Sequence, residues 1–332
     1  AVIFLIGGIL SYNYYQKIFG KAITKKTVLY VKPEDSLVDI KLKLEEFSKS
    51  PETFLWVAAR KNFSKPKVGS YLLKKGMSNN EVVNMLRIGN QTPVKVSFNN
   101  QDTLEKFAGR IAEQIATDSI TLLNSFTNKD FLDKNNFNKK TVLGIFIPNS
   151  YEFYWNTTAD NFRDKMLKEY KRFWNSSRLE KAKRLNLSKN EVTTLASIVQ
   201  KETAKTVERP IVAGLYLNRL RKNWPLQADP TIIYCIREVK GQDYVVKRVL
   251  TADLEIKSPY NTYKNRGLPP SLIAMPDISA IDAVLNAQKH NYYYMCANVE
   301  KIGYHTFAKT LSQHNRNAAK YHRWMNNQGV NR

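Results

Sequence analysis

Residues 188–203 read Ser-Lys-Asn-Glu-Val-Thr-Thr-Leu-Ala-Ser-Ile-Val-Gln-Lys-Glu-Thr, and they predict the helix around which this chain is organised. Ser188 and Glu191 have the spacing of a capping box, in which each side chain accepts a hydrogen bond from the backbone N–H of the other residue. Apolar residues then recur at the helical period and predict one buried stripe: Val192, Leu195, Ala196 and Val199. We therefore expect a helix that begins after Ser188, runs to about Thr203 and buries one face.

Glu202 is the chemically interesting residue of this helix. At about 100° per residue it lies roughly 70° from the middle of the buried stripe, beside Leu195 and Ile198. A carboxyl group at the edge of an apolar face loses hydration of its charged form, which raises its pKa toward the range useful for a general acid. Most helix glutamates are solvated or ion-paired, so the position alone leaves both roles open.

Three strand-turn-helix patterns precede this helix. They are a strand over 27–31 with a helix from Ser36 through Leu44, a strand over 71–73 with a helix from Ser78 through Leu86, and a strand over 94–98 with a helix after Thr103 that includes Ile111 and Ile115. We expect residues 27–92 to share one small core.

The middle of the chain changes in texture. Residues 124–140 are rich in Asn and Lys and predict an exposed linker or an irregular helix. An apolar run over 142–148 and a group of aromatic residues follow: Tyr151, Phe153, Tyr154 and Trp155. Core packing and stacking on sugar rings both remain open for this group.

The charge is strongly basic, with 52 Lys and Arg against 29 Asp and Glu and a formal net charge of +23. The basic residues are scattered, and no zinc-knuckle spacing, RNP-like motif or basic arm is present, so we expect no nucleic-acid partner. A basic surface suited to anionic lipid or an acidic polymer, and a compositional bias of the source, both remain open.

No cofactor and no catalytic metal are expected. The four histidines show no H-E-x-x-H pattern, and two cysteines cannot form a metal site alone. Cys235 and Cys296 stand among apolar and aromatic residues and are predicted to be buried. A disulfide between them is left open.

The chain begins with an apolar segment. Residues 1–10 are all apolar or glycine, and three tyrosines and several lysines follow, which is typical of a transmembrane helix leaving a bilayer. Ten residues are too few to span a membrane, which takes about 20. Because the chain starts at Ala1 rather than Met, we expect residues 1–20 to be a trimmed anchor, with a signal-peptide core or a buried segment as the alternatives. Lysines beside a membrane helix tend to lie on the cytoplasmic side, so those after this segment would place the rest of the chain there. We nevertheless expect the bulk of the chain to lie outside the cytoplasm.

Several blocks in one order resemble the endolytic murein transglycosylase family, the YceG-like group. The blocks are 147–151, 195–203, 208–210, 212–220, 225–234, 258–263, 267–270, 273–276, 305–307 and His314 with Asn315. The resemblance covers nearly all of the chain after residue 27. It implies an α+β fold with a truncated N-terminal transmembrane helix over 1–20, a small LysM-like module over 27–95 and a larger mixed catalytic domain over 96–332.

The resemblance also implies an activity. Members are single-pass inner-membrane proteins whose catalytic part faces the periplasm or cell wall. They cut nascent peptidoglycan strands internally between N-acetylmuramic acid and N-acetylglucosamine, without water, and leave 1,6-anhydro ends. The implied partners are peptidoglycan glycan strands, the membrane and peptidoglycan synthases of the penicillin-binding class. The family's catalytic glutamate corresponds to Glu202, and the chain departs from the family at Gln200 and Asn149, where relatives often have acids.

Six further residues in the matching blocks are candidate substrate contacts: Asn218, Arg219, Gln227, Asp229, Asn261 and Tyr263. Structural roles stay open for them, since Asp229 and Asn261 suit turns and Arg219 could pair with Glu208 or Asp229. The block 305–307 is expected to be a strand under the site. The alternative functions are a hydrolytic muramidase and a non-catalytic peptidoglycan-binding scaffold.

Overall fold

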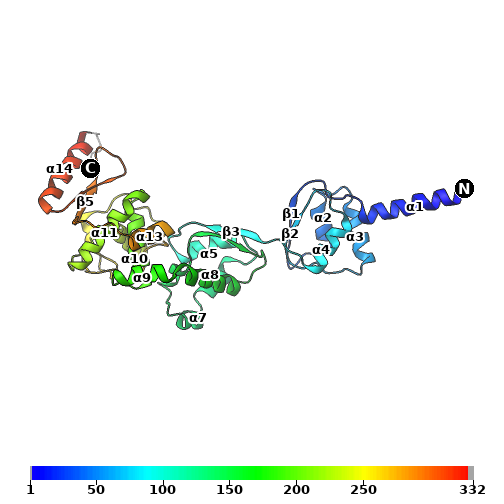
Figure 1. Ribbon diagram of the computed structural model, residues 1–332, viewed down its shortest axis with the longest axis horizontal. Coiled ribbons are helices and arrows are strands. Elements are labelled where there is room, and N and C mark those ends of the chain that lie inside the picture. Colours follow the sequence, from blue (N-terminus) through cyan, green and yellow to red (C-terminus); the bar gives the residue numbers. More distant parts are fainter. Residues whose placement is uncertain (1, 328–332) are drawn as a thin grey trace. The chain divides into compact units, whose positions relative to one another are not determined.

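The computed structural model describes residues 2–327 of the 332-residue chain. Ala1 of the expected anchor and residues 328–332 of the expected catalytic domain lie outside the described residues. The fold is mixed α+β, and the described part contains three two-stranded sheets, β1–β2, β3–β4 and β5–β6 (Figure 1). The chain divides into two compact units. The first comprises the described residues up to Ser97 with 109–122 and 150–162, and the second comprises 98–108, 123–149 and the rest from Arg163.

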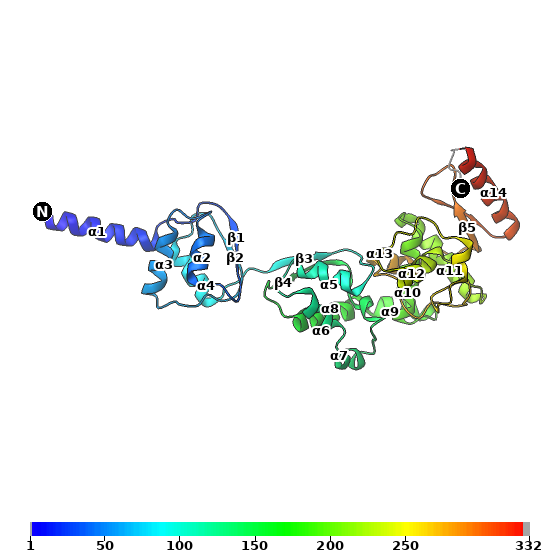
Figure 2. The ribbon, with the colours of Figure 1, turned by 180° about the vertical axis from the view of Figure 1, so that it is seen from behind.

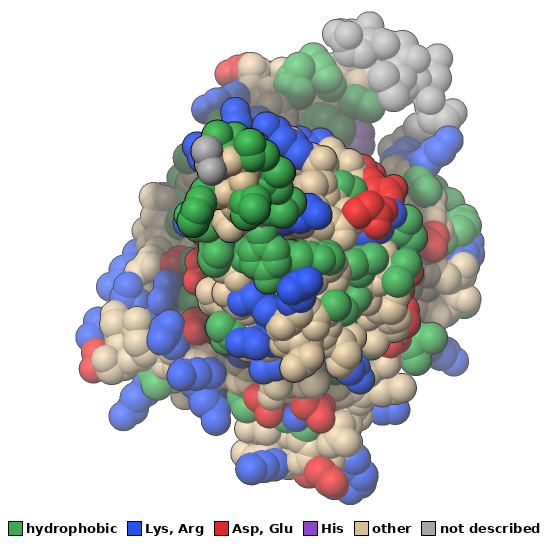
Figure 3. Space-filling view, turned by 90° about the vertical axis from the view of Figure 1, so that its right-hand side faces the viewer, with side chains coloured by type: hydrophobic (Ala, Val, Ile, Leu, Met, Phe, Trp, Pro, Cys, Tyr) green, Lys and Arg blue, Asp and Glu red, His purple; other side chains and the backbone are tan. Residues whose placement is uncertain are grey.

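The first unit starts with helix α1 (Val2–Phe19). Its residues 2–10 are exposed, and Figure 3 shows hydrophobic side chains gathered on the face that bears the start of this helix. Tyr14 packs edge-on against Trp56 with 5.3 Å between ring centroids, which ties the later turns of α1 to the rest of the unit. Within residues 2–327, no helix combines the length and the apolar content that crossing a membrane requires, so the predicted transmembrane helix is not found there.

The rest of the first unit is built on an antiparallel strand pair. Its elements are β1 (Thr27–Val31), α2 (Leu37–Leu44), α3 (Pro51–Arg60), β2 (Gly69–Leu73) and α4 (Asn79–Ile88). In the pair, Thr27 faces Leu73 and Val31 faces Gly69. Side chains from all five elements form one core, as predicted for residues 27–92. Helix α4 begins at a capping box and ends at Gly89, whose φ of 81° suits a residue without a Cβ atom.

The third strand-turn-helix pattern is not a repeat of the first two. Strand β3 (Val94–Phe98) pairs with β4 (Asn149–Phe153), as Figure 2 shows, and not with β1 or β2. The helix after it, α5 (Leu104–Ala112), ends before Ile115, which is buried but lies outside the helix. Helix α3 between β1 and β2 was not predicted, whereas β3 and α5 begin where the third pattern was predicted.

The segment over 124–140 was predicted as an exposed linker or an irregular helix, and it is partly helical. It contains the end of α6 (Ser119–Phe126) and the short helix α7 (Lys129–Lys134). Asn128 caps α7 by accepting a hydrogen bond from the N–H of Phe131. Phe131 and Leu132 of this helix are buried. The apolar run that follows forms the buried 3₁₀ helix η1 (Val142–Ile145), and α8 (Ala159–Phe173) comes after β4.

Helices dominate the second unit. They are α9 (Ser176–Arg184), α10 (Lys189–Glu202), α11 (Arg209–Arg221), α12 (Asp229–Lys240), α13 (Ile278–Leu285) and α14 (Leu311–Asn327), with the short turns η2 (Thr206–Glu208) and η3 (Thr251–Glu255). Strands β5 (Tyr294–Ala297) and β6 (His305–Ala308) pair antiparallel beside α14. Helix α10 packs against α11, α12 and α13 (Figures 1 and 2).

Helix α10 starts as predicted and is buried more widely than predicted. Ser188 and Glu191 form the expected capping box. Every residue from Val192 to Gln200 is buried, because three helices surround α10 where the apolar stripe indicated one covered face. Polar residues of the helix therefore point into the core as well. Thr193 and Ser197 satisfy their hydroxyl groups by donating to backbone carbonyl oxygens one turn back.

Candidate functional site

Glu202 lines a cavity of about 160 Å³ in the second unit. The cavity walls come from α10, α11, the start of α12, the loops before and after α12, and β5. The lining residues are Glu202, Leu215, Tyr216, Arg219, Leu226, Gln227, Asp229, Tyr263 and Met295. Four of the six predicted substrate contacts are among them: Arg219, Gln227, Asp229 and Tyr263.

Glu202 is the last residue of α10 and is partly buried. Burial raises the pKa of its carboxyl group, and the negative charge of Asp229 adds to this. The charge of His305, a hydrogen bond from Tyr216 and the charge of Arg219 act in the opposite direction without cancelling the rise. The net direction is the one expected from the position of Glu202 on the helix. A carboxyl group in this state keeps its proton to a higher pH and can donate it.

Tyr216 contacts the carboxyl group directly and was not singled out from the sequence. Its hydroxyl group donates a hydrogen bond of 3.0 Å to Oε2 of Glu202. Burial raises the pKa of Tyr216 well above its usual value, so the phenol stays protonated and remains a donor. The available signal was its place three residues before Arg219 on α11, which puts both side chains on one helix face.

Arg219 holds the cavity wall together. Its Nε donates to the carbonyl oxygen of Tyr293 at 2.7 Å, and Nη1 donates to the carbonyl oxygen of Leu226 at 2.7 Å and to Oε1 of Gln227 at 3.2 Å. The pairing with Glu208 or Asp229 considered from the sequence is not the arrangement found. Arg219 thus fixes the loop before α12 against the segment leading into β5.

Asp229 is a second carboxylate at the cavity. It is the first residue of α12, followed by Pro230 in the first turn, where proline is well tolerated. The hydroxyl group of Tyr263 donates a 2.5 Å hydrogen bond to its Oδ1. Gln227, two residues earlier, has a φ of 52°, so the chain turns sharply between the two lining residues.

Two predicted substrate contacts, Asn218 and Asn261, do not line the cavity. Nδ2 of Asn218 donates to the carbonyl oxygens of His290 at 2.7 Å and Tyr292 at 3.2 Å. Asn261 is fully buried, and its Nδ2 donates to the carbonyl oxygens of Leu254 in η3 at 2.9 Å and of Ile256 directly after η3 at 2.8 Å. Both asparagines hold loops in place, which agrees with the turn role left open for Asn261.

A buried polar network joins α10 to β6. Glu208 is 4% exposed and accepts a hydrogen bond of 2.7 Å from the backbone N–H of His305. Its Oε2 also lies 3.1 Å from Nδ1 of His305 and 3.1 Å from the hydroxyl oxygen of Thr203. The predicted strand over 305–307 exists as β6. It brings His305 close enough for its charge to act on Glu202, more than 100 residues away in sequence.

Gln200, one of the two expected departures from the family pattern, has a structural role. Its Nε2 donates to the carbonyl oxygen of Met275 at 3.2 Å, and its Oε1 accepts from the N–H of Asp277 at 2.6 Å. An amide satisfies both partners, whereas a carboxylate could only accept. Asn149, the other departure, is an exposed residue at the start of β4.

Within residues 2–327, no cluster contains three or more His, Cys, Asp or Glu side chains able to hold a metal ion. Cys235 and Cys296 are free thiols, and Cys296 is only partly buried, contrary to the prediction.

Comparisons with known proteins identify the family of this chain. The profile of the YceG-like family matches residues 29–320. An endolytic murein transglycosylase of Bacillus subtilis is 30% identical over 296 residues, which are 84% of this chain and 80% of the relative. One from Streptococcus pneumoniae strain D39 is 30% identical over 95% of this chain, which spans 62% of that relative. The crystal structure of a yceG-like protein from Listeria monocytogenes superposes with a TM-score of 0.58 at 26% identity, covering 88% of this chain and 98% of that one. The chain therefore belongs to the YceG-like family.

Proposed function

We propose that this chain is an endolytic lytic transglycosylase of peptidoglycan and that Glu202 is its catalytic acid. The observation that carries the proposal is a carboxyl group with a raised pKa that lines a polar cavity and accepts a hydrogen bond from a buried tyrosine. Membership of the YceG-like family and relatives named endolytic murein transglycosylases support the reaction class.

One carboxyl group can serve both halves of this reaction. Protonated Glu202 donates its proton to the oxygen that bridges N-acetylmuramic acid and N-acetylglucosamine, and the bond from C1 to that oxygen breaks. The resulting oxocarbenium-like centre is attacked by the C6 hydroxyl oxygen of the same muramic acid, and the Glu202 carboxylate takes the proton released. A 1,6-anhydro ring forms and no water is consumed. Because the nucleophile belongs to the substrate, its attack has the entropy advantage of an intramolecular reaction.

The neighbours of Glu202 suit this cycle. After the proton leaves, the O–H of Tyr216 and the positive charge of Arg219 stabilise the carboxylate. We assign the exposed polar atoms of Gln227, Asp229 and Tyr263 to hydrogen bonds with sugar hydroxyl or acetamido groups. Asn218 and Asn261 position loops instead.

A hydrolytic muramidase is the second candidate, because Asp229 lines the same cavity. Ordinary glycosidases use two carboxyl groups, one as acid and one as base or nucleophile. In this chain Asp229 accepts a hydrogen bond from the hydroxyl group of Tyr263. If Asp229 activated water, the product would carry a reducing muramic acid end, and Asp229→Asn would be as inactive as Glu202→Gln.

The remaining parts of the proposal concern the rest of the chain. We assign residues 27–95 to a LysM-like module that holds glycan and residues 96–332 to the catalytic domain. The exposed apolar side chains of residues 2–10 support attachment to the inner membrane as part of a single-pass anchor, with the catalytic domain on the cell-wall side. Peptidoglycan synthases are the proposed protein partners. A deletion of residues 27–95 that left glycan binding unchanged would refute the role of the module.

The test of the activity is mass analysis of the muropeptides released from purified peptidoglycan by the full chain. Internal cleavage should give glycan fragments whose muramic acid ends are lighter than hydrolytic ends by one water. Reducing ends would identify the muramidase, and glycan binding without any cleavage would identify a non-catalytic scaffold.

A further inference from the structure

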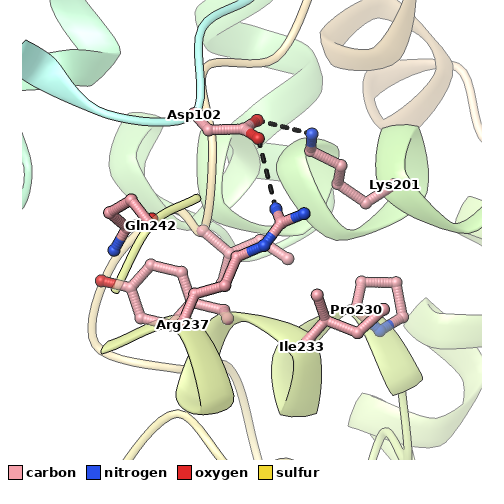
Figure 4. A pocket seen from close by; sticks show the side chains of 8 residues that line it. Asp102, Lys201, Pro230, Ile233, Arg237 and Gln242 are labelled. Atoms are coloured by element: carbon pink, nitrogen blue, oxygen red, sulfur yellow. Dashed lines mark hydrogen bonds and ion pairs between the residues drawn. The ribbon is translucent and has the colours of Figure 1, made fainter. Parts of the chain in front are cut away.

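A second cavity of about 170 Å³ opens beside the ends of α10 and α12, and Figure 4 shows it from close by. Its lining residues are Asp102, Lys201, Pro230, Ile233, Tyr234, Arg237, Gln242 and Ile273. None of these residues was singled out for function from the sequence, and none of them has a step in the proposed reaction.

One carboxylate in this cavity faces two cations. Oδ1 of Asp102 lies 2.5 Å from Nζ of Lys201, and its Oδ2 lies 3.4 Å from Nη1 of Arg237. The three side chains are each about 30% exposed, so water and solutes reach the group. The trio has a net charge of +1. Within the part of the chain that the structure describes, no hydrogen bond from Nη2 of Arg237 is found, so this nitrogen can donate to an anion.

The rest of the wall is largely apolar. Pro230 and Ile233 of α12 lie on one side, as Figure 4 shows, and Ile273 and the ring of Tyr234 complete the lining. Gln242 adds an amide group, whose Nε2 donates to Glu238 at 2.8 Å while the oxygen can accept a further bond. A ligand that fits combines a carboxylate with small aliphatic groups and backbone amides. These are the features of a short acidic peptide.

The two cavities are lined by neighbouring residues of the same two helices, α10 and α12. Lys201 lines this cavity and Glu202 lines the catalytic one, and Pro230 and Asp229 are divided in the same way. A glycan strand held at Glu202 carries a peptide on each muramic acid, and the stem peptides of peptidoglycan combine free carboxylates with alanine methyl groups. We propose that the cavity around Lys201 and Arg237 is a subsite for the acidic stem peptide of the glycan. The identity of the peptide rests on the proposed function, whereas the anion site itself does not.

The opposing explanation is an ion-pair trio that only fastens residue 102 to α10 and α12. The two explanations differ in the sign of one effect. If a ligand carboxylate competes with Asp102 for the two cations, Asp102→Asn should strengthen binding. If the trio is only structural, Asp102→Asn removes an ion pair and cannot strengthen binding.

The test measures binding of N-acetylmuramoyl-L-alanyl-D-glutamate by calorimetry, with a matched probe whose glutamate carboxyl groups are amidated. Neither probe has a glycosidic bond to cut, so binding is independent of catalysis. The full chain should bind the acidic probe about tenfold more tightly than the amidated one, as expected for one charge-assisted contact. Arg237→Gln should abolish that difference, and Asp102→Asn should bind the acidic probe severalfold more tightly.

Arg172→Gln is the matched control, since Arg172 is an ion-paired surface arginine of α8 that does not line the cavity, and it should bind as the unaltered chain does. Equal binding of the two probes, or weaker binding by a folded Asp102→Asn variant, would overturn the subsite. If Arg237→Gln fails to fold, the two probes and Asp102→Asn still decide. Cleavage of peptidoglycan is measured in parallel. Cleavage with equal binding of the two probes would refute only the subsite, whereas preferential binding of the acidic probe without cleavage would refute only the proposed activity.

Discussion

Replacing Glu202 by glutamine should abolish peptidoglycan cleavage while keeping the fold. The amide has nearly the shape of the carboxylic acid, and its oxygen can still accept the hydrogen bond from Tyr216. It cannot give or take a proton at neutral pH. Loss of a general acid costs about 100-fold to 10,000-fold in rate, and the upper end is expected because the same residue also acts as the base. The assay is the rate of anhydro-muropeptide release.

The same substitution should stabilise the protein at neutral pH. Burial raises the pKa of Glu202 in the folded chain above the ordinary value of 4.5, which applies to the unfolded chain. At a pH between these two pKa values, the folded chain keeps a proton that the unfolded chain releases. Stability therefore falls as pH rises through that window. Each unit of pKa difference corresponds to about 1.4 kcal/mol, or roughly 3 to 6 °C in melting temperature for a domain of this size. Glutamine has no such penalty, so the gain should be present at pH 7 and vanish below pH 4.5.

Glu191→Gln is the control on the same helix. Glu191 closes the capping box of α10, where glutamine also serves, and it does not line the cavity. This variant should keep its activity and show no pH-dependent gain in stability. The assignment is wrong if Glu202→Gln keeps near-normal cleavage, or if it loses activity together with its melting transition. The raised pKa would be refuted if the difference in melting temperature between Glu202→Gln and the wild type were the same at pH 4 and at pH 7.

Three further substitutions test the surroundings of the site. Tyr216→Phe removes the donor that lowers the pKa of the catalytic carboxyl group, so the pH–rate profile should move to higher pH and the maximal rate should fall by about 10-fold to 100-fold. Gly214→Ala places a Cβ atom 2.3 Å from the carbonyl oxygen of Gln288 and should cost about 1–3 kcal/mol in denaturant unfolding, whereas Gly109→Ala, with nothing within 4 Å, should cost nothing. Gln200→Glu leaves a carbonyl oxygen without its donor and should destabilise by about 1–3 kcal/mol at pH 7, with a smaller loss near pH 4.5, where the new carboxyl group takes up its proton.

Local patterns predicted the elements that local interactions determine. The capping boxes at Ser78 and Ser188 involve residues three apart, so the start of α4 and of α10 could be predicted from the sequence. Helix α3 was missed although Ser50 followed by Pro51 is a common start of a helix; Ser50 makes no side-chain cap in this fold. The pairing of β3 with β4 joins segments about 50 residues apart, and no pattern in either strand specifies its partner.

The site was predicted in part for the same reason. Glu202 and four of the predicted contacts come from continuous sequence blocks, and the structure brings them to one cavity: Arg219, Gln227, Asp229 and Tyr263. Asn218 does not line this cavity, since the direction of a side chain on a helix depends on which neighbour packs there. Here Asn218 meets the loop at 290–292.

The protonation of Glu202 depends on which acceptors receive the hydrogen bonds of Arg219. A guanidinium bonded directly to Glu202 would favour the carboxylate and hold its pKa down. In this fold the nitrogens of Arg219 donate to the carbonyl oxygens of Tyr293 and Leu226, so the cation is fixed beside the acid without capturing it. Tyr216 supplies the one direct hydrogen bond described for the Glu202 carboxyl group, and a neutral phenol stabilises the charge less than a guanidinium does. Glu202 can therefore start protonated, and its carboxylate is still stabilised once the proton has been transferred. This balance depends on the segment leading into β5 and the loop before α12, because their carbonyl oxygens accept the hydrogen bonds of Arg219.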